Sequence, residues 1–318
     1  MAGQFVVVAF VLTMGAALLL LPRVGAQGSA SAQDGALSGR IAYIREGGVW
    51  LLADGKPQLL ANNEVFRYPS WSPDGSRLGI TIFGNAHSDL HTLNADGSPL
   101  RQLTFHTQVF RTQDTSFALH TRWSPDGKTL GFVSDRNSND MEIWLADPER
   151  GAARRVSVDD GRGGVDGISW FPDSRSVAVA SFRLSTTPLP VSQIWRYDTV
   201  GRAWQKLTEE SEGAYDPAVS PDGKSLAYVA RRGRDHTVWL AGADGKNPVP
   251  VMQKGRNRSL TWSPDGKYLA FLTDKVAGAE ITAVAVSGDA ESGLQVSQPQ
   301  QLTTDQQIEI QGGLSWAK

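Results

Sequence analysis

The stretch Trp123-Ser124-Pro125-Asp126-Gly127 decides the fold, because the chain repeats it. Proline presets φ at the second position of a turn, Asp suits the third and Gly the fourth, so Ser-Pro-Asp-Gly predicts a type I turn between antiparallel strands. An apolar run at residues 130–133 follows directly and reads as the return strand. The phrase occurs four more times, intact or altered, at residues 71–75, 170–174, 219–223 and 262–266.

The repeats have the period of a propeller blade. Trp71, Trp123, Trp170, Val219, Trp262 and Trp316 are about 52, 47, 49, 43 and 54 residues apart. Near the start, expected strands at 41–45, 49–53 and 57–60 have no turn phrase before them, while residues 308–316 look like an innermost strand. We therefore predict an all-β fold for residues 39–318, a six-bladed β-propeller closed by pairing of the C-terminal strand with the first blade.

The repeats resemble those of TolB-type β-propellers. The resemblance rests on the WSPDGK phrase, the aliphatic strand after it, Ser134-Asp135-Arg136, Ile143-Trp144 and the Leu-Thr pairs at 103–104, 207–208 and 302–303. It covers nearly all of residues 39–318 and implies the fold, but related repeats also occur in periplasmic scaffold proteins and in prolyl-oligopeptidase-like enzymes. TolB carries an α/β domain before its propeller and the peptidases carry a hydrolase domain. Neither is recognisable here, so the resemblance implies a free-standing propeller.

The N-terminal residues read as an export or anchoring segment. Residues 5–21 are apolar, and Val24 and Ala26 supply the small residues of a signal-peptidase site. We predict a signal peptide or N-terminal membrane anchor at 1–26 and a flexible linker at 27–38. A signal peptide and an anchor both predict an extracytoplasmic protein, either secreted or tethered. We expect contact with the membrane only through residues 1–26, and only if this segment is not cleaved. The reverse orientation, with a cytoplasmic propeller, is the third alternative.

Composition excludes several kinds of function. The net charge is −2 and no basic stripe is present, so we expect no nucleic-acid partner. The absence of cysteine excludes disulfides, thiolate metal sites and a Cys nucleophile. The sequence contains no nucleophile elbow, P-loop or dinucleotide fingerprint. We therefore expect a protein without a cofactor, and we assign no catalytic or metal-binding residue.

Histidines leave one enzymatic alternative open. His87, His106, His120 and His236 are expected on one face of the propeller. Three converging imidazoles can hold a transition metal, although these four have no fixed ligand spacing. A metal-dependent or polar-ligand enzyme of lyase or hydrolase type is therefore the alternative to a binding protein.

The expected binding site lies at the mouth of the central channel, where the innermost strands begin. Long connections at 104–119 and 184–191 are expected on the same face. A ring of mixed charge there suits a protein or peptide partner in the cell envelope, although solvated strand ends would give the same pattern. A structural subunit of a membrane-associated complex is a further alternative. The predicted partner-binding residues are Arg67, Tyr68, Phe110, Arg111, His120, Asp166, Asp216, Arg258 and Glu309.

Overall fold

The computed structural model describes residues 37–106, 116–157, 161–184, 190–290, 292–304 and 307–318. These residues belong to one compact unit that is built from strands. Within them, no helix has the length and apolar character needed to cross a membrane. The predicted signal peptide or anchor at 1–26 lies outside the described residues and stays a prediction, as does most of the predicted linker.

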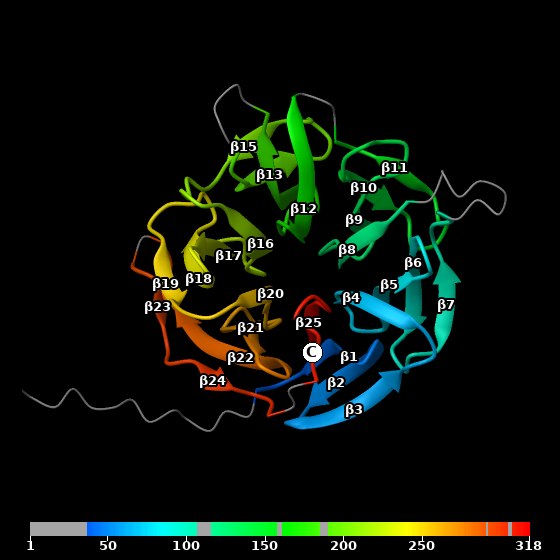
Figure 1. The fold of residues 1–318 in the computed structure, drawn as a ribbon, viewed down its shortest axis with the longest axis horizontal. Helices are drawn as coiled ribbons and strands as arrows, with labels where there is room; N and C mark the ends of the chain where they lie inside the picture. The colour runs from blue at the N-terminus through cyan, green and yellow to red at the C-terminus, as the bar shows by residue number, and fades with distance from the viewer. Residues whose placement is uncertain (1–36, 107–115, 158–160, 185–189, 291, 305–306) are drawn as a thin grey trace, which may run out of the picture. The chain divides into compact units, whose positions relative to one another are not determined.

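The strands form six antiparallel sheets around a central axis (Figure 1). Five sheets follow chain order from the axis outward, apart from two short outer strands that both pair with β22. They comprise β4 (Val65–Trp71), β5 (Arg77–Phe83), β6 (Ser88–Asn94) and β7 (Pro99–Gln102); β8 (Ala118–Trp123), β9 (Leu130–Ser134), β10 (Glu142–Ala146) and β11 (Ala153–Arg155); β12 (Arg162–Trp170), β13 (Ser176–Arg183), β14 (Gln193–Asp198) and β15 (Trp204–Lys206); β16 (Ala214–Val219), β17 (Ser225–Arg232), β18 (Asp235–Gly242) and β19 (Val249–Met252); and β20 (Asn257–Trp262), β21 (Tyr268–Lys275), β22 (Gly278–Ser287), β23 (Gln295–Val296) and β24 (Gln300–Gln301).

The sixth sheet takes strands from both ends of the described chain. It comprises β25 (Leu314–Ala317), β1 (Arg40–Arg45), β2 (Gly48–Ala53) and β3 (Lys56–Ala61). In β25, Leu314 lies opposite Tyr43 and Trp316 lies opposite Ile41. β1 therefore has a strand on each side, and the ring closes without an open edge there. The predicted six-bladed propeller and its closure are confirmed.

The closing strand is shorter than the sequence predicted. β25 begins at Leu314, because Gly313 has φ 92° and the residues before it form a turn in which Gly312 N–H donates to the Glu309 carbonyl at 2.8 Å. Ile308 makes isolated bridges outside β25. The prediction of one strand over 308–316 was therefore wrong for residues 308–313. Glu309 lies ahead of the strand, not at its start.

Each intact Ser-Pro-Asp-Gly turn is a hydrogen-bonded unit. The Gly127 N–H donates to the Ser124 carbonyl at 2.9 Å, and its φ of 69° is one that glycine adopts without strain. The Ser124 hydroxyl donates to Asp126 Oδ1 at 2.6 Å and accepts from the Thr129 N–H at 3.0 Å. The same two side-chain bonds form at Ser72, Ser220 and Ser263. These turns therefore fix the return of the chain from the first strand to the second.

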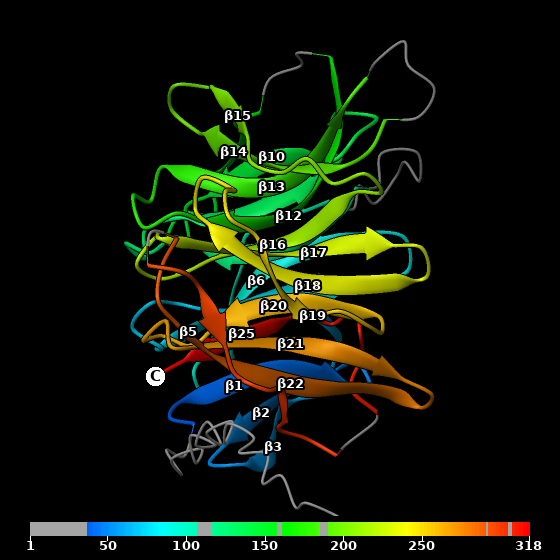
Figure 2. The ribbon, with the colours of Figure 1, turned by 90° about the vertical axis from the view of Figure 1, so that its left-hand side faces the viewer.

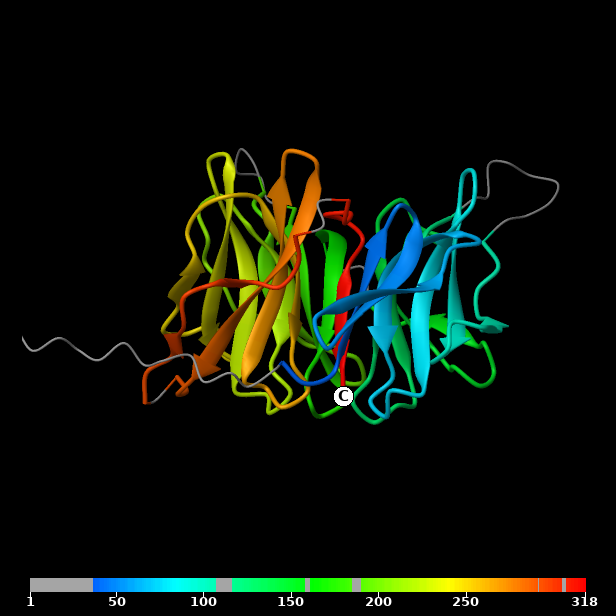
Figure 3. The same ribbon diagram turned by 90° about the horizontal axis from the view of Figure 1, so that it is seen from below.

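The turns gather at one end of the central channel. Their prolines line a cavity of about 390 Å³ together with the C-terminal Lys318. Figure 3 shows the C-terminus at this end of the ring. The lining prolines of the turns are Pro73, Pro125, Pro172, Pro221 and Pro264.

The hydrophobic core lies between neighbouring blades, whose sheets Figure 2 shows from the side. Trp123, at the end of β8, is 6% exposed and packs with Leu90 and Phe132. A Cβ added at Gly79, in the preceding blade, would lie 3.0 Å from the Trp123 indole nitrogen. The blades thus approach so closely that this position has no room for a side chain. This packing fixes the innermost strands relative to one another.

Candidate functional site

The innermost strands share an irregularity three residues before their terminal Trp or Val. In β4, β8, β12, β16 and β20 the pairing register shifts at this point, which marks a β-bulge. In the sixth blade the equivalent residue is Gly313, which immediately precedes β25. All six have a left-handed backbone: Tyr68 (φ 54°), His120 (56°), Gly167 (64°), Asp216 (47°), Ser259 (59°) and Gly313 (92°).

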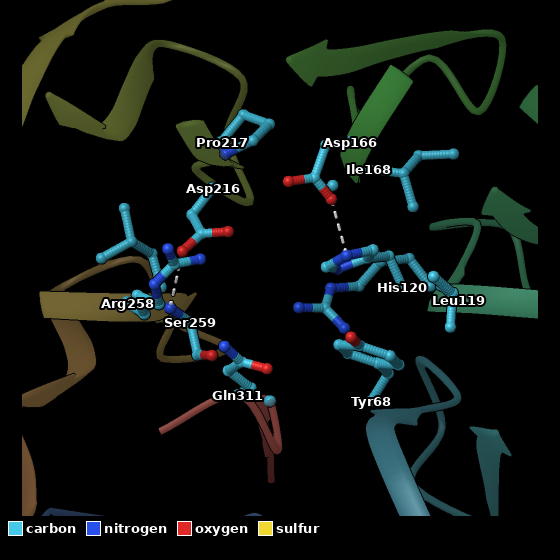
Figure 4. Close-up of a pocket in the computed structure, with 14 residues that line it drawn as sticks. Tyr68, Leu119, His120, Asp166, Ile168, Asp216, Pro217, Arg258, Ser259 and Gln311 are labelled. Atoms are coloured by element: carbon cyan, nitrogen blue, oxygen red, sulfur yellow. Dashed lines mark hydrogen bonds and ion pairs between the residues drawn. The ribbon is translucent and has the colours of Figure 1, made fainter. Parts of the chain in front are cut away.

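These six residues line one cavity of about 270 Å³, here called the central cavity. A bulge re-aims the side chains beside it, so the irregularity brings groups from all six blades to one place. Figure 4 shows labelled polar side chains from several blades around the open centre. The remaining lining residues are Leu119, Arg122, Asp166, Ile168, Pro217, Arg258, Leu260 and Gln311.

Five of the nine predicted partner-binding residues line the central cavity, and that they bind a partner stays a prediction. They are Tyr68, His120, Asp166, Asp216 and Arg258.

Of the other four predicted residues, Arg67 and Glu309 are described and do not line the central cavity. Arg67 Nη2 lies 2.5 Å from Glu309 Oε2 in an ion pair, and the second Glu309 oxygen accepts the Gly47 N–H at 2.6 Å. These two side chains therefore link β4 to the segment before β25. Phe110 and Arg111 lie outside the described residues, and their role stays a prediction.

His120 is held between a carboxylate and an aromatic ring. Its Nε2 lies 2.7 Å from Asp166 Oδ1, and its ring centroid lies 4.3 Å from that of Tyr68 (Figure 4). Burial alone would raise the pKa of Asp166, but the hydrogen bond and charge of His120 outweigh it and lower that pKa below its ordinary value. The Asp166 carboxylate is therefore an anion at neutral pH and fixes the orientation of the imidazole.

Tyr68 and Asp216 complete the polar lining. Burial raises the pKa of Tyr68 to about 12, and the nearby carboxylates of Asp166 and Asp216 add to the shift. The phenol thus keeps its proton at neutral pH and can donate a hydrogen bond. Asp216 accepts the Ser259 N–H at 3.2 Å.

Arg122 lines the central cavity and also the cavity at the opposite end of the channel, so it lies between the two. Burial lowers the pKa of Arg122, which nevertheless stays charged. Sequence reasoning missed this residue, yet the repeats contain its signal. The other blades have small residues at the position just before the terminal Trp or Val: Ser70, Ser169, Ala218, Thr261 and Ser315.

The histidines do not assemble a metal centre in the part of the chain that the structure describes. No group of three or more His, Asp or Glu side chains is placed there to hold an ion. His87 and His106 each lie 3.8 Å from Asp89, and His106 is buried. His120 instead faces the central cavity, so the expected convergence of imidazoles is not observed among these residues.

Comparison with known proteins finds relatives of low sequence identity. No family model matches the chain. An uncharacterized protein of Agrobacterium fabrum is 26% identical over 257 residues, which cover 66% of this chain and 85% of that protein. The Tol-Pal system protein TolB of Anaeromyxobacter dehalogenans is 29% identical over 135 residues, covering 40% of this chain.

The structural likeness is broader than the sequence likeness. The crystal structure of TolB from Acinetobacter baumannii superposes with a TM-score of 0.68 at 19% identity, over 89% of this chain and 67% of that one. The chain has the fold of TolB-type β-propellers. It spans only 29% of the length of the Anaeromyxobacter TolB, so the likeness concerns the propeller and the activities of the whole relative do not follow from it.

Proposed function

We propose that this TolB-type propeller is a non-catalytic, extracytoplasmic protein that binds a protein or peptide partner in the cell envelope through the central cavity and the face around it. The observation that carries the proposal is the set of left-handed bulges. Glycine occupies this conformation in two blades, whereas Tyr68, His120, Asp216 and Ser259 occupy it in the other four. A left-handed backbone costs a residue with a side chain roughly 1–2 kcal/mol.

Such strain persists where the side chain has a use, and strained residues cluster at binding sites. All four side chains meet at the same cavity, so one use accounts for all of them. The envelope location is supported by the apolar run at residues 5–21 and by the similarity to Tol-Pal system proteins. A protein or peptide partner is supported by the open, mixed-charge ring that all six blades surround.

The proposal is tested by crosslinking and affinity capture from envelope fractions, with the full chain and two glycine variants. Tyr68→Gly relaxes the backbone and removes an aromatic contact, and should weaken capture at least about tenfold, as loss of an aromatic anchor does. Asn137→Gly is the matched control, since Asn137 has φ 58°, is exposed and does not line the cavity. We expect it to capture the same partner as the wild type.

Two results would contradict this function. Capture by Tyr68→Gly equal to that of the control would remove the cavity from partner binding. Capture that is lost only when residues 1–38 are deleted would favour a structural subunit held at a membrane-associated complex.

The His120–Asp166 pair favours one second candidate, a polar-ligand enzyme of lyase or hydrolase type that uses the same cavity. A carboxylate that orients an imidazole is the usual arrangement of a histidine general base. Mass spectrometry of ligand recovered from the wild-type protein separates the two functions. An unaltered ligand supports binding, and a cleaved ligand supports catalysis.

A further inference from the structure

The acidic groups of the central cavity already have hydrogen-bond donors within the protein. Asp166 is paired with His120 at 2.7 Å and also accepts from the Gly167 backbone. Asp216 accepts the Ser259 N–H at 3.2 Å. The demand of these two carboxylates for donors is therefore met in part before any ligand arrives.

The basic groups of the cavity feel the charges of these carboxylates, Arg122 that of Asp216 and Arg258 that of Asp166, but donate no hydrogen bond to them in the described residues. Arg122 donates to the Thr121 carbonyl at 2.9 Å, and neither Arg122 nor Arg258 forms an ion pair with a carboxylate of the described residues. A guanidinium has five N–H donors and no acceptor. The Tyr68 hydroxyl, whose proton is retained at neutral pH, makes no hydrogen bond within the described residues. The unused capacity of the cavity is thus mostly that of donors.

Size and arrangement limit what can use these donors. The cavity volume of about 270 Å³ suits a single side chain or chain end, and it lies below the usual range for sites that enclose whole small molecules. Figure 4 shows Asp166 and Gln311 on opposite sides of the open centre, with Arg258 and Tyr68 flanking Gln311. A negative group on the Gln311 side would therefore meet donors and lie away from Asp166. Asp216, which Figure 4 draws beside Arg258, already accepts the Ser259 N–H at 3.2 Å.

We propose that the central cavity recognises a carboxylate of the partner, with Arg258 and Arg122 as its charged donors and Tyr68 as a neutral one. The inference rests on the proposed function, which it makes chemically specific. The carboxylate has two possible sources in a peptide partner, the C-terminus or an Asp or Glu side chain. The chemistry is the same for both: charge-assisted hydrogen bonds between guanidinium and carboxylate.

Three N-acetylated tripeptides test the inference on the purified full-length protein, with affinities measured by ligand-observed NMR. They are acetyl-Ala-Ala-Ala with a free carboxylate, acetyl-Ala-Glu-Ala-amide and acetyl-Ala-Gln-Ala-amide. At least one acidic peptide should bind about tenfold more tightly than the Gln peptide, the effect of one hydrogen bond to a charged group. Preference for the first peptide assigns the site to a chain end, and preference for the second assigns it to an acidic side chain.

Variants identify the donors. Arg258→Gln and Arg122→Gln should each reduce the affinity of the preferred acidic peptide to that of the Gln peptide. Arg256→Gln is the matched control, because Arg256 lies two residues away on the chain, is exposed and pairs with Asp274 at 3.6 Å. It should leave the affinity unchanged.

The inference is overturned if the wild-type protein binds all three peptides equally, a comparison that needs no variant to fold. It is also overturned if the control lowers affinity as much as Arg258→Gln does. Failure of the proposed function gives a different result from failure of this inference. If the proposed function fails, acidic peptides bind as expected, but capture of an envelope partner does not depend on Tyr68. Conversely, a Tyr68-dependent partner together with equal peptide affinities would leave the proposed function standing without this inference.

Discussion

At the scale of single residues, strain and function can be separated at His120. Its φ of 56° disfavours any residue with a Cβ, and two other blades relieve the same conformation with Gly167 and Gly313. The imidazole itself is stabilised by Asp166 and by the ring of Tyr68. The backbone conformation of His120 therefore destabilises the fold, and the contacts of its side chain stabilise it.

We predict that His120→Gly is more stable than His120→Ala. Both variants lose the imidazole and its ion pair, but only glycine relaxes the left-handed backbone, which favours it by about 1 kcal/mol. Urea unfolding of the two variants measures the difference directly. At an ordinary strand position glycine is instead the less stable of the two, so finding alanine equal or better would show that position 120 is not strained.

The sequence reached part of this site and missed the rest for a physical reason. The expectation that the first residues of the innermost strands face the channel identified His120 and Arg258, because these strands all begin around the same opening. The bulge itself was not predicted, since only Gly167 and Gly313 among the six residues indicate a positive φ by their type. Gln311 was missed because the strand was expected to begin before it, and Arg122 because only the first residues of the innermost strands were expected at the channel.

At the scale of the element, the Ser-Pro-Asp-Gly turn explains why the fold could be predicted so fully. Its Ser and Asp bond to each other and to the backbone within a few residues, so its conformation depends little on distant contacts. The structure of such a turn can therefore be predicted from its own residues alone. The start of β25 is marked by no such self-contained pattern, and that bound was predicted less well.

The carboxylate of this turn makes stability depend on pH. The Ser72 hydroxyl and the Ser76 backbone and hydroxyl lower the pKa of Asp74 from 3.8 to about 2. Because the pKa is lower in the folded state, Asp74 stabilises the fold fully above about pH 4, and that contribution is lost as the pH falls toward 2. Asp74 is exposed, so solvent screening limits the effect to about 1 kcal/mol.

We predict that Asp74→Asn is less stable than the wild type at pH 7 and that the difference shrinks between pH 4 and pH 2. Urea unfolding across this range measures it. Ser72→Ala removes the largest cause of the lowered pKa and should change the pH profile in the same direction. A destabilisation by Asp74→Asn that is equal at pH 7 and pH 2 would show that the carboxylate charge contributes nothing.

At the scale of the whole propeller, one pairing joins the two ends of the described chain. β25 contacts β1 in its own sheet and lies beside the innermost strands of both neighbouring blades (Figure 1). Leu314 and Trp316 are buried in the core shared with β21 and β22. Since every blade packs on two others, an opening at this position exposes two blade faces at once, and the central cavity loses the blade that supplies Gln311.

We predict that a chain ending at Gly313 no longer unfolds cooperatively at the wild-type midpoint and self-associates, because β1 becomes an unpaired edge and two large buried side chains are lost. Size-exclusion chromatography and thermal unfolding check both effects. Removal of Lys318 alone is the control, since that residue lies outside β25 and is exposed. Adding a synthetic peptide of residues 310–318 to the truncated chain should restore the monomer and its unfolding transition. A truncated chain that stays monomeric with an unchanged midpoint would mean that the ring is held by inter-blade packing alone.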